Sequence, residues 1–345
     1  MPHRWVSACI AGLVISATPL AAQTTLPPIS LGGGLRTSFV HDSPDDADDT
    51  DTFALDSARL YISGPVTEQI KFMFNTEYDG ASNKIGVLDA VARFEMSPKF
   101  NVWMGRFLPP SDRANLYGPY YAHHWGVYTD GIQNGHPFVF QGRDNGVMYW
   151  GDFSKVKVSG GVFDGKSATG DPELLTAARV QVDFWDKEAG YYLNGTYYGA
   201  KNLLGIGAAI QAQDGDTATT FDFLFEKRLG DEGGVLTIES EYANYDQLGG
   251  YDGRYGSSEG AYVLGAFLFP KQVGMGKFEV LGKYAAATFR EGGVLEDYDQ
   301  DTTEFNFNYV IKEFNARLMF FVINTDFSAV KTSGTRVGVG LQLQM

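Results

Sequence analysis

Apolar and polar residues alternate one by one in many short stretches along the chain. The last ten residues show this most clearly, because apolar side chains occupy every second position, at Val337, Val339, Leu341, Leu343 and Met345. Arginine, glycine and glutamine fill the positions between them. Successive side chains of an extended chain point to opposite faces, so the pattern predicts a β-strand with one apolar and one polar face.

Sixteen such stretches predict strands at residues 29–40, 55–63, 69–79, 87–96, 99–107, 145–151, 155–163, 175–185, 203–212, 219–228, 235–245, 261–269, 277–287, 303–312, 314–323 and 335–345. Most have the length of about 9–11 residues that a tilted strand needs to cross a bilayer. The connectors alternate between long and short, as in an all-β transmembrane antiparallel β-barrel with loops at one end and turns at the other. The long connectors are residues 42–53, 108–144, 164–174, 246–260, 289–302 and 324–334.

Residues 186–202 test this scheme. A further strand is conceivable there, because Tyr191, Tyr192, Tyr197 and Tyr198 are good β formers. Counting it would give an odd number of strands and would put a long loop at the turn end of the barrel. We therefore expect residues 186–202 to form one long periplasmic connector, with both chain termini at the same end.

The N-terminus predicts export. Residues 1–22 combine Arg4, an apolar run and small residues before Gln23, as in a signal peptide that is cleaved near Ala22. A membrane anchor is the alternative, but the apolar run is shorter than the ~20 residues that a spanning helix needs. The remaining residues, 23–345, are expected to form one barrel domain. The only cysteine, Cys9, lies in the predicted signal, so no disulfide is expected.

Composition narrows the function classes. The chain has 27 Lys and Arg against 42 Asp and Glu, a formal net charge of −15, which argues against a nucleic-acid partner. Aromatic residues make up 14% of the chain, and no helical periodicity accompanies them. This combination supports an all-β chain.

The polar strand faces carry the charges that matter for function. If the apolar faces meet lipid, the polar faces line a water-filled lumen. The predicted basic wall comprises Arg36, Arg59, Lys71, Arg93, Arg317 and Arg336, extended by Arg179, Lys155 and Lys157. The predicted acidic wall opposite comprises Asp222, Glu226, Glu239, Glu241 and Glu279. Such a transverse field would bias ion selectivity, although lumen charges can also be solvated without selecting a solute.

Strand pairing extends this prediction to the seam of the barrel. The first and last strands become neighbours when the barrel closes. We therefore expect Arg36 and Arg336 to meet across the seam and to make the basic wall continuous.

Several segments resemble the phosphate-selective porin O and P family. They are residues 89–94, residues 102–110 with Gly105-Arg106-Phe107 before two prolines, and the stretches 190–202, 233–237 and 266–270. The resemblance implies a sixteen-stranded outer-membrane barrel, usually a homotrimer, whose long third loop folds into the pore. It also implies passage of anions such as phosphate. The acidic first loop and the mixed lumen depart from phosphate-selective members, so anion and cation selectivity both stay open.

The third loop, residues 108–144, has the strongest functional signal among the connectors. Ser111 and Asp112 are expected to cap a short helical turn that begins at Arg113. Loops of this length inside a compact fold are usually functional or disordered, and the aromatic residues here argue against disorder. Folded inward, the loop would narrow the pore and present Arg113 and Arg143 to permeants. A trimer contact or a surface loop is the alternative.

Two enzyme motifs lack the context that their chemistry needs. Residues 160–167 match a nucleotide-binding string, but Pro172 and its neighbours oppose the helix that should follow. Residues 256–260 match a hydrolase string, but they are expected in a Gly-rich loop rather than between a strand and a helix. We therefore expect no catalytic residue, no metal site and no cofactor.

The sequence as a whole predicts a passive porin in the outer membrane of a Gram-negative cell. Its expected partners are membrane lipid, lipopolysaccharide, two further copies of the chain in a homotrimer, and small hydrophilic solutes or ions. A soluble secreted β-protein that acts as a binding module is the alternative. A membrane-embedded hydrolase is a third possibility, against which the lack of a well-placed Ser/His pair counts.

Overall fold

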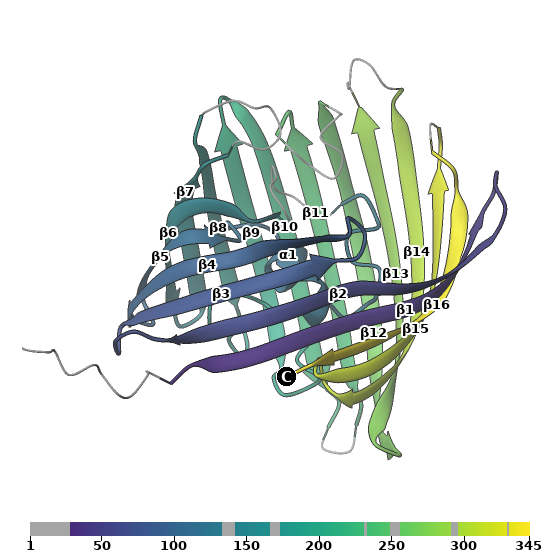
Figure 1. Cartoon of the computed structure of the whole chain (residues 1–345), viewed down its shortest axis with the longest axis horizontal. Coiled ribbons are helices and arrows are strands. Elements are labelled where there is room, and N and C mark those ends of the chain that lie inside the picture. The colour runs from purple at the N-terminus through teal and green to yellow at the C-terminus, as the bar shows by residue number, and fades with distance from the viewer. Residues whose placement is uncertain are drawn as a thin grey trace, which may run out of the picture.

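The structure is a computed structural model that describes residues 28–132, 142–165, 173–230, 233–248, 256–290, 296–329 and 331–345. The predicted signal peptide, residues 1–22, lies outside these ranges. Within them, sixteen strands close into an antiparallel barrel (Figure 1), which confirms the predicted fold class.

The strands are β1 (Ser30–Pro44), β2 (Thr50–Pro65), β3 (Ile70–Asp79), β4 (Lys84–Ser97), β5 (Phe100–Phe107), β6 (Asp144–Phe153), β7 (Val156–Phe163), β8 (Leu175–Asp183), β9 (Leu203–Gln213), β10 (Asp216–Arg228), β11 (Val235–Asp246), β12 (Ser257–Val273), β13 (Gly276–Arg290), β14 (Tyr298–Lys312), β15 (Ala316–Phe327) and β16 (Gly334–Gln344). Each strand pairs with its neighbours in sequence, and β1 pairs with β16 to close the barrel. Residues 186–202, all of which are described, contain no strand, so the predicted long connector is confirmed.

Several strands run further than the sequence predicted. The predicted loop at 42–53 shrinks because β1 continues to Pro44 and β2 begins at Thr50. Ser257 and its neighbours, expected in a loop, begin β12 instead. A ladder can continue beyond the bilayer because pairing satisfies its backbone, whatever the side chains are. Both faces of such an extension lie in water, so the alternation that marks a membrane strand disappears there.

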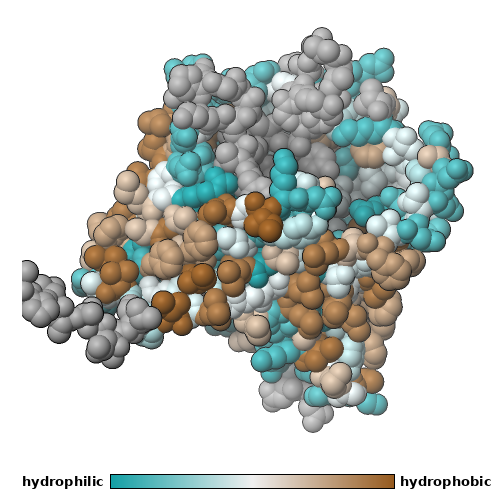
Figure 2. All heavy atoms as spheres, viewed as in Figure 1, coloured by the Kyte–Doolittle hydropathy of each residue, from teal (hydrophilic) through white to brown (hydrophobic). Residues whose placement is uncertain are grey.

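The outer surface of the barrel is apolar over its middle. Alternate strand residues point outward and are about half exposed, including Phe72, Phe305, Phe320 and Val337. Figure 2 shows brown and tan side chains spread across the outer faces of the strands, with teal ones gathered toward the strand ends. A closed barrel with such an exterior is stabilised by lipid around it. Among the described residues, no helix is long and apolar enough to cross a bilayer.

Two connectors enter the barrel from opposite ends. The third loop enters from the loop end and carries α1 (Arg113–Tyr121) into the lumen, as predicted for the described part of that loop. Residues 184–202, between β8 and β9, enter from the turn end. The two segments meet inside, where the Leu193 N–H donates to the Leu116 carbonyl at 3.3 Å and the Gly195 N–H donates to the Tyr121 carbonyl at 2.8 Å.

Candidate permeation site

The helix α1 begins where the sequence predicts it. The Asp112 carboxylate accepts a hydrogen bond from the Asn115 N–H at 2.7 Å, which caps the helix N-terminus. The helix is kinked at Gly118, whose φ of 61° lies in the left-handed region that favours glycine. Pro119 follows directly, and after the kink the carbonyls of Pro119 and Tyr120 accept hydrogen bonds from Arg36 and Gln342 of the seam strands β1 and β16.

Three members of the predicted acidic wall hold the third loop. Glu239 accepts a hydrogen bond from the Tyr117 hydroxyl at 2.8 Å, and Glu241 accepts one from the Ala114 N–H at 3.3 Å. Glu279 lies 2.7 Å from the ring Nε2 of His123. All three carboxylates are buried. They therefore contact the loop, and none of them lines the larger cavities described below.

Glu226, the fourth member, holds the inserted connector. Its carboxylate accepts hydrogen bonds from the Thr196 hydroxyl at 2.7 Å, the Tyr197 N–H at 2.9 Å and the Gly199 N–H at 2.8 Å. A carboxylate that receives backbone N–H groups in this way fixes the conformation of the turn that donates them. The tip of the connector is therefore anchored to β10.

A cluster of two arginines and two carboxylates joins the third loop to the connector. Arg113 forms a bidentate ion pair with Glu188, with one contact at 3.0 Å, and Arg179 pairs with Asp222 at 2.8 Å. The Arg113 Nε lies 3.6 Å from Asp222. Burial alone would raise the pKa of Glu188, but the Arg113 guanidinium outweighs it and holds that pKa below its ordinary value. Arg113 was expected to face permeants; the structure instead buries it against a partner whose position the sequence does not reveal.

Two arginines of the predicted basic wall hold the third loop at the seam. Arg36 donates to the Pro119 carbonyl at 2.6 Å and lies over the Trp125 ring at 4.0 Å. Arg317 is fully buried and donates to the Ala122 carbonyl at 2.7 Å. Their role in this structure is to fix the loop against β1 and β15.

Glycines on the seam strands make room for this contact. A Cβ added at Gly34 would lie 2.6 Å from the Tyr120 ring, and one at Gly340 would lie 2.3 Å from the Trp125 ring. The absence of a side chain at these two positions therefore lets the loop approach the barrel wall closely.

Arg336 does not join Arg36 across the seam. The register pairs Arg36 with Gln342 and Arg336 with Asp42, because the strands of a barrel are staggered along one another. The Arg336 side chain is 47% exposed and lies 4.0 Å from Asp42 near the loop end. The expectation of a continuous basic wall through Arg336 is thus wrong.

Space remains between α1, the connector and strands β2 to β5. An inner cavity of about 490 Å³ lies beside α1, and a turn-side cavity of about 550 Å³ opens near Pro98 at the turn end. Arg93 and Tyr192 line both cavities, so the two spaces adjoin at these residues. The other predicted site residues here are Arg59 and Arg143 in the inner cavity and Lys71 in the turn-side cavity.

Carboxylates accompany the cations of both cavities. Arg59 pairs with Glu77 at 2.8 Å, Arg143 lies 3.6 Å from Asp89, and Lys71 pairs with Glu95 at 2.6 Å. Arg93 lies further from Glu95, at 3.7 Å. Arg93 therefore lies beyond hydrogen-bond distance of its carboxylate partner and shares that carboxylate with Lys71.

Sequence reasoning missed most of the uncharged lining. Tyr61 and Asn75 lie on the same strand faces as Arg59 and Lys71, so the period-two pattern could have found them. Trp103 is inward by the same rule. Tyr192 had no such signal, because it comes from a connector whose path is set by tertiary contacts.

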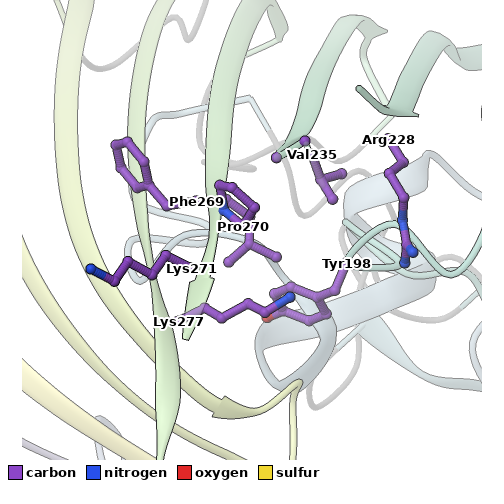
Figure 3. A pocket seen from close by; sticks show the side chains of 10 residues that line it. Tyr198, Arg228, Val235, Phe269, Pro270, Lys271 and Lys277 are labelled. Atoms are coloured by element: carbon purple, nitrogen blue, oxygen red, sulfur yellow. The ribbon is translucent and has the colours of Figure 1, made fainter. Parts of the chain in front are cut away.

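A third space, the rim cavity, lies at the turn end beside β11 and β12. It measures about 330 Å³, and Figure 3 shows Arg228, Lys271 and Lys277 around Tyr198, Phe269 and Pro270. The cavity lies outside the predicted basic wall.

These features define an outer-membrane β-barrel of the porin architecture: a closed barrel, an apolar exterior, a charged interior and an inward third loop. No known family profile and no curated protein sequence matches the chain.

Solved structures do match the fold. The anion-selective porin from Comamonas acidovorans is 16% identical, with a TM-score of 0.60 over 93% of this chain and 100% of that one. OprB of Pseudomonas putida is 8% identical, with a TM-score of 0.61 over 92% and 94%. OmpT of Vibrio cholerae, in its trimer form, is 14% identical, with a TM-score of 0.56 over 93% and 100%. The chain therefore has the porin fold.

Proposed function

We propose that the protein is a passive porin in which small hydrophilic solutes, with a preference for anions, diffuse along the wall formed by β2 to β5. The observation that carries this proposal is the pair of adjoining cavities at Arg93, both lined by cationic side chains. Elsewhere in the described lumen, α1 and the connector cover the acidic wall. A solute on this path meets Arg59, Arg93, Arg143 and Lys71 rather than Glu239 or Glu241.

Charge arithmetic along the path supports a preference for anions. Cationic groups lower the energy of an anion in a narrow, low-dielectric passage and raise that of a cation. The paired carboxylates reduce this field without reversing it, because Lys71 and Arg93 share the single carboxylate of Glu95. Phosphate and chloride are the simplest anions that such a passage would conduct.

The finer assignments are part of the same proposal. Membership of the phosphate-selective porin O and P family is supported by the place of Gly105-Arg106-Phe107 at the end of β5, directly before the inward loop. A homotrimer is supported by the trimer form of OmpT, which shares the fold. Lipid and lipopolysaccharide are the partners that the apolar exterior and the outer-membrane position call for.

Reconstitution tests the proposal directly. The purified chain, without its signal peptide, should require detergent for extraction and should form ohmic channels in planar bilayers. In a KCl gradient, the reversal potential should lie closer to the equilibrium potential of chloride than to that of potassium. Release from membranes by salt alone would contradict the proposal that the protein is a membrane channel. A cation-selective reversal potential would contradict the proposed preference for anions.

A further inference from the structure

Arg93, which lines both cavities, has a guanidinium without a close partner in the described part of the chain. Its Nη1 lies 3.7 Å from Glu95, beyond hydrogen-bond distance, and the Glu95 carboxylate also pairs with Lys71 at 2.6 Å. The Arg93 side chain is 19% exposed, so a solute in the cavities can reach it. Arginine N–H groups can only donate, so a ligand that brings an acceptor to Arg93 would be stabilised.

The two carboxylates that line the cavities are already engaged. Asp89 accepts hydrogen bonds from the Asn75 amide at 2.8 Å and from the Tyr192 hydroxyl at 3.3 Å. Glu95 accepts one from the Lys71 ammonium at 2.6 Å. The cations that line the two cavities outnumber the lining carboxylates, because Arg59, Arg93, Arg143 and Lys71 are accompanied there only by Asp89 and Glu95. This imbalance favours a ligand group that only accepts, such as a carboxylate.

Aromatic rings form much of the remaining lining. Tyr192 lies between the two cavities, and its ring packs against Trp103 at 5.8 Å between centroids. Tyr191 packs against the same indole, with its ring centroid 5.3 Å from that of Trp103. The other lining aromatics are Tyr61, Tyr117, Tyr121, Tyr197 and Trp150. Flat rings of this kind stack on flat ligands and add to the attraction of a charged group.

From these observations we infer that the adjoining cavities form a binding site for small aromatic carboxylates. The carboxylate lies at Arg93, which both cavities share, with Arg59 in the inner cavity and Lys71 in the turn-side cavity as the neighbouring cations. The ring stacks on Tyr192. The volumes of about 490 and 550 Å³ lie within the range of small-molecule sites.

Other ligand classes fit this lining less well. A neutral sugar has hydroxyl groups that need acceptors as well as donors, and the carboxylates here are engaged. Inorganic phosphate would satisfy the donors but would leave the aromatic faces without a partner. A bound aromatic acid uses both features.

The inference rests on the proposed porin function for its biological meaning, but its test does not depend on conduction. Benzoate is titrated into the detergent-purified full barrel by calorimetry, with acetate and benzyl alcohol as probes that lack the ring or the charge. In planar bilayers, benzoate is added to the turn side and its block of the KCl current is recorded. Saturable binding of benzoate, tighter than that of either control probe, is expected in both measurements.

Variants locate the site. Arg93→Gln should weaken benzoate binding about tenfold, the effect of losing one charged hydrogen bond. Tyr192→Leu should weaken it by about two- to tenfold through lost stacking. Lys277→Gln, which removes a cation from the rim cavity, is the matched control and should leave binding unchanged. If Arg93→Gln does not fold, Arg93→Lys keeps the charge without the planar fork and should give an intermediate loss.

The outcomes separate the two proposals. Channels that conduct KCl but bind benzoate no better than acetate would overturn the aromatic-acid site and leave the porin proposal standing. Benzoate binding in detergent without channel formation would overturn the porin proposal and leave the aromatic-acid site standing. Equal losses from Arg93→Gln and Lys277→Gln would show binding to cationic surface in general, and would also overturn the site.

Discussion

The lumen of this barrel has two halves that both carry charged side chains on their inward faces and behave differently. Along β10 to β14, the charged side chains point inward and are covered by the third loop and the connector, each held by hydrogen bonds. Along β2 to β5, charged side chains, most of them cationic, line open cavities. The difference lies in what the chain places in front of them. A charge in the lumen becomes either an anchor or a selectivity element according to whether a connector reaches it.

The largest expected effect comes from removing the link between the two inserted segments. Glu188→Gln leaves Arg113 buried without its bidentate partner, and breaking a buried ion pair costs about 3–5 kcal/mol. The connector should loosen, and single-channel conductance should rise. Conductance in planar bilayers and heat-modifiable gel mobility measure the two effects. Unchanged conductance with an intact barrel would show that the connector does not limit the pore.

Charge reversal in the open half should change selectivity. In the double variant Arg59→Glu with Arg93→Glu, we expect the ratio of chloride to potassium permeability to fall by about tenfold, because the local potential changes sign. The reversal potential in a KCl gradient measures this ratio. Arg336→Glu reverses a charge outside both cavities and serves as the control. An equal shift in both variants would assign selectivity to the general field of the barrel.

A side chain placed at the seam should destabilise the third loop. Gly340→Ala puts a Cβ 2.3 Å from the Trp125 ring, and overpacking of this kind costs about 1–3 kcal/mol. Gly265→Ala is the control, because a Cβ there meets no atom within 4 Å. The free energy of unfolding, measured with denaturant in detergent, should be lower for Gly340→Ala than for Gly265→Ala. A loss of unfolding free energy in Gly265→Ala as large as that in Gly340→Ala would contradict the steric explanation.

The smallest effect is a pH dependence of the third loop with two opposite slopes. Burial lowers the pKa of His124 well below its ordinary 6.5, helped by Lys283, whereas for His123 the carboxylate of Glu279 outweighs burial and raises the pKa. The raised pKa of His123 stabilises the loop below pH ~6.5, and this contribution is lost as pH rises through that pKa. The lowered pKa of His124 has the opposite sign, so its contribution is complete above pH ~6.5 and is lost as pH falls below that value through the lowered pKa.

Thermal unfolding between pH 5 and about 9 measures these slopes. His123→Gln should remove the loss of stability on the alkaline side, and His124→Asn should remove the loss on the acid side. The same slopes in both variants would show that neither imidazole titrates in the loop.

Much of the fold could be predicted from the local pattern of apolar and polar residues. The strand number, the pairing of neighbours and the outward apolar faces of β3, β14 and β15 follow from period-two alternation, since lipid on one side and water on the other impose it. The strand ends were less accurate, because beyond the bilayer both faces meet water and the pattern stops. The cap at Asp112 was predicted because it depends only on residues three positions apart.

The candidate permeation site could be predicted only in part from the sequence. The alternation of side chains along the strands placed Arg59, Lys71 and Arg93 on an inward face, and these residues line the open cavities. It gave the same orientation to Glu239 and Glu241, which are covered. The sequence contains no local signal for which inward charges a connector will reach, because those contacts join residues more than a hundred positions apart.

The alternation at Val337 to Met345 by itself determined that β16 has a lipid face and a lumen face. It did so because side-chain direction in a strand depends only on position. The tertiary structure decided the rest: the stagger that separates Arg36 from Arg336, the connector that buries Arg113, and the cavities left at Arg93. These depend on barrel shear and on long-range hydrogen bonds, which no short stretch of sequence contains.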